Sequence, residues 1–133
     1  MKRIKNIKQA SEYLNISEND ILNFHKFKNK DWKYQDKNGN CHLFRKKNRK
    51  YIELTKKVKA KYIWNFNNRD WSYLDEKGYE HLFRFTRGKW IELTENVNTK
   101  YVYSFLNGDW EYVDENNYFN LFNKNNKLIK KYK

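Results

Sequence analysis

The stretch DWSYLDEKGYEHLFRFTRGKWIELTENVNTKYVYSF, from Asp70 to Phe105, is the middle copy of a sequence repeat that decides the fold. The same pattern begins at Asp31 and again at Asp109, so the period is 39 residues. Seven columns are identical in all three copies, including the Asp, Trp and Tyr near the start of each copy. A repeat of this period predicts one structural unit per copy.

Each copy has the pattern of four β-strands separated by turns. In the middle copy the expected strands are residues 71–75, 80–85, 89–94 and 100–105. Trp71 and Tyr73 lie on one face at a period of two, as Ile91 and Leu93 do later. The runs between the strands are rich in Gly and Asn, which tolerate the positive φ of tight turns. The apolar spacing of a helix is absent from this stretch.

We therefore predict an all-β fold of three tandem 39-residue, four-stranded antiparallel repeats in one domain over residues 21–133. The repeats are expected at about 22–60, 61–99 and 100–133. Three repeats of four strands are what a β-trefoil-like fold requires, and such closure would leave few open edges. A propeller-blade-like unit and an open β-repeat array are the alternatives.

The N-terminal segment, residues 1–20, has two interpretations. Residues 7–24 resemble a helix-turn-helix, with Ala10 and Leu14 at packing positions and Ser17 as the N-cap of the second helix. Alternatively, residues 13–19 align with residues 90–96 and are a decayed fragment of the repeat. Short apolar runs are ambiguous between the two, and the helical interpretation is favoured.

The charge is unevenly distributed over the copies. The chain has 29 Lys and Arg against 16 Asp and Glu, a net charge of +13. Residues 22–60 have 13 basic and 3 acidic side chains, whereas residues 61–99 have 6 of each, so the first copy has a net charge of +10 and the second zero. Copies of one fold that differ in charge indicate a site on a single copy.

The basic residues are densest in the run from Arg45 to Lys50, the expected hairpin tip between the second and third strands of the first copy. Clustered cations with aromatic neighbours are typical of phosphate neutralisation combined with base stacking. We therefore predict a non-catalytic protein that binds DNA or RNA through a basic face of the first repeat. The candidate residues are Arg45, Lys46, Lys47, Arg49, Lys50, Tyr51, Lys56, Lys57, Lys59, Lys61 and Trp64. A solvated basic loop and binding of another polyanion are the alternatives.

Two other functions fit the sequence. A lectin-like protein would stack and hydrogen-bond sugars on the repeated columns Asp31, Trp32, Asp70, Trp71, Asp109 and Trp110. The same Trp columns are also typical of equivalent core positions, and the Asp columns of turn caps. A protein-binding inhibitor or adaptor is the third hypothesis.

Enzyme signatures are not found in the sequence. His42 and His81 share a repeat column with Asn120, which is not how the convergent ligands of one metal site are distributed. We expect no catalytic site, no metal and no cofactor. Cys41 is the single cysteine, and no apolar stretch of about 20 residues is present, so we expect a cytoplasmic protein without a membrane span.

Overall fold

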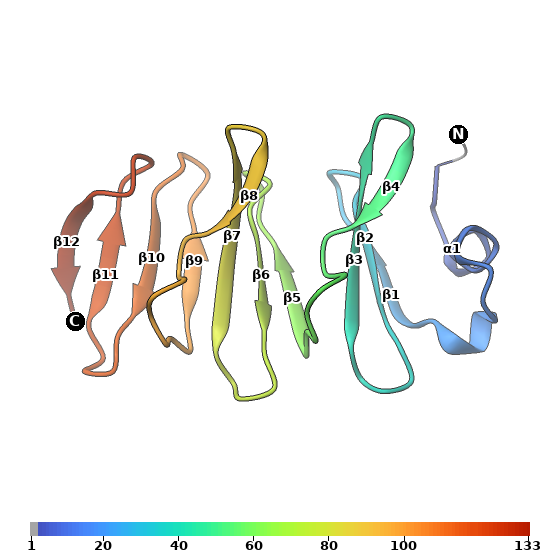
Figure 1. Cartoon of the computed structure of the whole chain (residues 1–133), viewed down its shortest axis with the longest axis horizontal. Coiled ribbons are helices and arrows are strands. Elements are labelled where there is room, and N and C mark those ends of the chain that lie inside the picture. The colour runs from blue at the N-terminus through green and yellow to red at the C-terminus, as the bar shows by residue number, and fades with distance from the viewer. Residues whose placement is uncertain (1–2) are drawn as a thin grey trace. The chain divides into compact units, whose positions relative to one another are not determined.

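A computed structural model of the chain describes residues 3–133, in which one α-helix and one 3-10 turn precede twelve strands (Figure 1). The helix α1 is Ile7–Leu14 and the 3-10 turn is Glu18–Asp20. The strands are β1 Leu22–Lys26, β2 Trp32–Gln35, β3 Cys41–Lys47, β4 Lys50–Glu53, β5 Tyr62–Asn65, β6 Trp71–Leu74, β7 Glu80–Thr86, β8 Lys89–Glu92, β9 Val102–Ser104, β10 Trp110–Val113, β11 Phe119–Phe122 and β12 Leu128–Tyr132.

The strands form three four-stranded antiparallel sheets, one for each repeat, which confirms the predicted all-β class. The sheet orders are β1-β2-β3-β4, β5-β6-β7-β8 and β9-β10-β11-β12. Each sheet in the described residues therefore pairs its own strands in sequence order, as a meander. This pairing does not confirm the trefoil-like closure that the sequence favoured.

The chain divides into two compact units, Met1–Ile63 and Trp64–Lys133. The boundary falls inside β5, so the first unit contains the first sheet and the second contains the third sheet with most of the second. The single β domain expected over residues 21–133 stays a prediction. No helix within residues 3–133 combines the length and the hydropathy that crossing a lipid bilayer needs.

The N-terminal segment contains the expected helix, but the helix-turn-helix interpretation is wrong. Asn6 caps α1 by accepting a hydrogen bond from the backbone N–H of Gln9, and Asn15 ends the helix in the left-handed conformation. Ser17 caps only the short 3-10 turn. Residue Leu22 is already paired with Gln35 of β2, so strand pairing replaces the second helix. Residues 13–19, the alternative decayed repeat fragment, form no strand, because α1 includes the first two of them.

In the first unit, the N-terminal segment covers one face of the first sheet. Ile4, Ala10 and Ile21 are buried against the aromatic residues of that face: Trp32, Tyr34, Phe44 and Tyr51. Trp32 and Phe44 stack with their ring centroids 4.2 Å apart. Burial of these large aromatic rings contributes to the stability of the first unit.

In the second unit, the third sheet packs against the second. Leu82 of β7 is fully buried against Val102 and Trp110 of the third sheet. The chain that leaves β8 returns to the start of β7, where the N–H of Glu80 donates to the carbonyl of Thr99. Leu43 and Leu82, the repeated Leu of the first two copies, are therefore interior positions, whereas Leu121 of the third copy is only partly buried.

Candidate nucleic-acid interface

The predicted basic hairpin tip is formed by β3 and β4. Lys47 is paired with Lys50 across the hairpin. Asn48 and Arg49 between them have φ of 51° and 70°, which is the two-residue turn favoured in hairpins. Lys46, Lys47, Arg49 and Lys50 are all exposed. We refer to these four cations as the tip cluster.

The tip cluster has two features that disfavour the hairpin. Arg49 adopts the left-handed conformation at the repeat position where the second copy has Gly88, and a non-glycine residue there is strained by about 1–3 kcal/mol. Lys47 is also directly opposite Lys50, whereas Thr86 is opposite Lys89 in the second copy. Like charges in such a pair are destabilising. If hairpin stability alone mattered, Gly and Thr, which the second copy has at these two positions, would be more favourable than Arg49 and Lys47.

The second group of predicted cations, Lys56, Lys57, Lys59 and Lys61, is also exposed and lies on the connection from β4 to β5. We refer to it as the connection cluster. Ala60 of this connection is bridged to Cys41, at the end of β3 opposite Lys47. A strand of this length separates the two ends by about 20 Å. The structure therefore divides the predicted basic face into two clusters.

Arg45 does not belong to the interface. Its guanidinium is buried and donates from Nε and Nη2 to Asp31 Oδ2, at 2.8 and 2.7 Å. Arg84 and Asp70 make the same pair in the second copy. The sequence did contain this signal, because Arg is present in that column in the neutral second copy as well.

The two predicted stacking residues behave differently. Tyr51 is buried under the N-terminal segment, where its hydroxyl accepts from the N–H of Ile4 and its ring contacts Tyr13 edge-on. It is therefore unavailable to a base, and that prediction is wrong. Trp64 belongs to the second unit and is 38% exposed.

The alternative sugar site is not formed. Trp32, Trp71 and Trp110 are at most 4% exposed and fill the same slot in each sheet, stacked on a Phe of the neighbouring strand. Asp31 and Asp70 are buried and paired with arginines, so their carboxylates are not presented to a ligand. Asp109 is partly buried beside Asn107. A sugar has no access to the tryptophan faces.

The two repeated histidines are each held between two carboxylates. His81 bonds Glu92 through Nδ1 and Asp75 through Nε2, each at 2.8 Å. The hydrogen bond to Glu92, with that to Asp75, outweighs burial and raises the pKa of His81 to about 9. Both ring nitrogens are therefore engaged by carboxylates, and the ring links β7 to β8 and to the turn after β6.

The corresponding cluster of the first copy has the same geometry. His42 bonds Glu53 at 2.7 Å and Asp36 at 2.8 Å, and its pKa is raised for the same reasons. Burial would raise the pKa of Asp36, but hydrogen bonds from His42 and the backbone lower it overall. In the third copy Asn120 takes the histidine's place and donates to Asp114 Oδ2 at 3.1 Å.

One buried acid was missed by the sequence analysis. Glu80 is 8% exposed, and its Oε1 has no hydrogen-bond partner among the described residues. Burial raises its pKa to about 7. The same column has Cys41 and Phe119 in the other copies. Because the other two residues of this column are apolar, the sequence did indicate an interior position.

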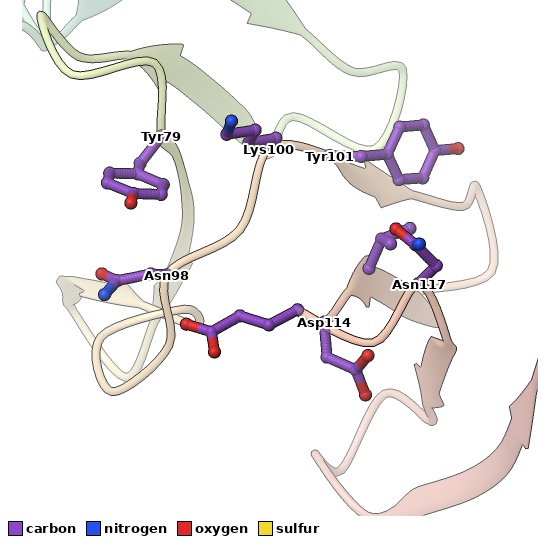
Figure 2. Close-up of a pocket in the computed structure, with 8 residues that line it drawn as sticks. Tyr79, Asn98, Lys100, Tyr101, Asp114 and Asn117 are labelled. Carbon is purple, nitrogen blue, oxygen red and sulfur yellow. The ribbon is translucent and has the colours of Figure 1, made fainter.

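Figure 2 shows a hollow of about 430 Å³ between turns of the second and third sheets. Its lining residues are Tyr79, Asn98, Lys100, Tyr101, Val113, Asp114, Glu115 and Asn117. Tyr101 and Asp114 point away from the middle of the hollow, and Asp114 Oδ1 already accepts from the backbone of Asn116 and Tyr118. The labelled side chains thus lack the convergent polar groups of a ligand site. No His, Cys, Asp or Glu cluster of residues 3–133 is arranged to hold a metal ion.

No protein-family model matches the chain, and no curated protein matches its sequence.

Proposed function

We propose that the protein is a non-catalytic nucleic-acid-binding protein whose tip cluster contacts the phosphate backbone. The observation that supports this most directly is a charge of +10 in residues 22–60 against zero in residues 61–99, on the same four-stranded fold. The tip cluster is exposed, and cations at this density bind phosphates with release of counterions.

Two further features support the tip cluster over the connection cluster. Arg49 adopts a conformation that favours glycine, and Lys47 lies opposite Lys50. Residues that disfavour the fold in this way are typical of functional positions. The proposal needs only the hairpin itself, so it is compatible with a trefoil-like, a blade-like or an open arrangement of the sheets. We also infer a cytoplasmic location, because the single cysteine is a buried free thiol.

Substitution of the tip cluster tests the proposal. The variant with Lys46, Lys47, Arg49 and Lys50 all replaced by Gln is compared with the wild type by fluorescence anisotropy, using labelled single-stranded DNA, RNA and duplex DNA. Four phosphate contacts predict that log Kobs falls against log salt with a slope of about −2.8 for single strands and about −3.6 for duplex DNA. The variant should lose this slope together with its affinity.

The connection cluster provides the matched control. Replacing Lys56, Lys57, Lys59 and Lys61 with Gln removes the same charge from exposed positions, so net charge alone predicts equal losses in the two variants. The proposal predicts that the tip variant loses much more affinity. Equal losses, or a tip variant that binds like the wild type, would disprove it. Tryptophan fluorescence verifies that both variants are folded.

A further inference from the structure

An aromatic hollow is present at the sheet edges of the second unit, outside all the predicted cation clusters. It has a volume of about 290 Å³ and is lined by Trp64, Asn65, Phe66, Asn67, Tyr103, Ser104 and Leu106. We refer to it as the edge pocket. It is formed at β5 and β9, each of which is the outermost strand of its sheet. Tyr103 is 42% exposed and Leu106 is 77% exposed, so large apolar surfaces face solvent here.

The wall of the edge pocket is held rigidly. The ring of Tyr103 contacts Phe66 and Phe105 edge-on, with centroid distances of 5.5 and 4.8 Å. The Ser104 hydroxyl donates to Asp70 Oδ2 at 2.6 Å, and Arg84 bonds the same oxygen at 2.7 Å. Aromatic surfaces that are fixed before binding lose little entropy when a ring stacks on them.

We propose that the edge pocket binds an unpaired nucleobase, stacked against Trp64 and Tyr103, and that the protein therefore prefers single-stranded nucleic acid. This inference rests on the proposed function and adds the class of nucleic acid to it. Every base has a face that stacks on aromatic rings, and only an unpaired base presents that face. The amide of Asn67, which also lines the pocket, has both donors and an acceptor for a base edge.

The surroundings favour a nucleotide over a sugar. The residues that line the edge pocket include no carboxylate, and Phe66 and Leu106 are apolar. Lys124 lies against Gly108, in the turn that contains Leu106. Cations beside an apolar, aromatic pocket suit a base with its phosphate, whereas a sugar needs several polar partners for its hydroxyls.

The test compares Trp64→Ala and Tyr103→Ala with Tyr118→Ala, which removes an exposed tyrosine of the same unit that lies outside the pocket. Each is titrated with oligothymidine, with duplex DNA of the same length and with a maltose oligosaccharide. The pocket variants should bind oligothymidine about 5- to 150-fold more weakly than the wild type. The slope of log Kobs against log salt and the affinity for duplex DNA should be unchanged in these variants. Tyr118→Ala should bind all three ligands as the wild type does. Trp64→Phe keeps a ring, so it should retain most of the affinity.

The outcomes separate this inference from the proposed function. If the pocket variants bind oligothymidine as the wild type does, or lose duplex and single-strand affinity equally, the edge pocket does not stack a base. Salt-independent binding of the oligosaccharide that needs Trp64 would also overturn the inference, in favour of a sugar site. If instead the tip variant binds normally while Trp64→Ala does not, the proposed phosphate contacts are wrong and the base site remains.

Discussion

Replacing His81 with Asn should destabilise the protein in neutral and acidic solution and have little effect in basic solution. In the wild type, the imidazolium of His81 is held by Glu92 and Asp75, and its pKa is raised to about 9 from 6.5. Asn is the matched replacement, because Asn120 occupies this position in the third sheet and keeps a hydrogen bond to Asp114.

The magnitude follows from the two pKa values. One pKa unit corresponds to 1.36 kcal/mol, so the rise from 6.5 to about 9 sets a ceiling of roughly 3.4 kcal/mol. The side chains of His81 and its two carboxylates are 22–25% exposed, and solvent screening reduces the expected value to about 1–2 kcal/mol. Because the folded-state pKa is raised, this stabilisation is complete below pH 6.5 and is lost as the pH rises through about 9.

The assay is urea unfolding of the wild type and His81→Asn at about pH 6 and about pH 9.5, followed by tryptophan fluorescence. The difference in unfolding free energy between the two proteins should shrink by about 1–2 kcal/mol over this interval. An NMR titration of the His81 Cε1–H gives the folded-state pKa directly. A difference that is the same at both pH values, or a histidine that titrates near 6.5, would refute the reasoning.

Four further substitutions test the interior and the turns of the second unit. Glu80→Gln should stabilise the protein by about 1–3 kcal/mol at about pH 8 but not at about pH 4.5. The reason is that burial raises the pKa of Glu80 and disfavours its ionised form. Urea unfolding of both proteins at the two pH values measures the difference. Leu82→Ala should lower the free energy of unfolding by about 2–5 kcal/mol by leaving a cavity between the sheets, and a urea midpoint equal to that of the wild type would contradict this. Gly108→Ala should be more destabilising than Gly88→Ala in thermal unfolding, since both have positive φ but only the new Cβ at Gly108 lies 3.0 Å from Lys124 Cβ.

The strands were predictable because each copy gives the same signals in the same order. Residues 89–94 alternate strictly and end at turn-forming residues, and β8 is found at Lys89–Glu92. The repeat also indicated that Trp32, Trp71 and Trp110 fill equivalent core positions, and all three are buried. The trefoil-like closure was less predictable, since period and strand number do not specify which strands of different copies pair.

The candidate site was predicted only in part, because charge density in a sequence does not distinguish the faces of a strand. Arg45 belongs to the same basic run as Lys46, but the alternation of β3 turns it toward Asp31. Tyr51 was expected to stack on a base, yet α1 and the residues before it cover this ring. Docking of a separate segment leaves no trace in the local pattern. The edge pocket was missed for a related reason, since its two sides are one repeat apart in sequence.

The meander order of the sheets has a consequence for how the chain folds. Every strand pairs with a strand that directly neighbours it in sequence, and turn residues such as Asp75 bind backbone N–H groups only two and four positions away. Strand pairing of this kind closes only short loops, so each sheet should form rapidly. All of α1 and the first sheet precedes β5 in sequence. During synthesis, the first sheet and its helical cover can therefore assemble before the second repeat has left the ribosome.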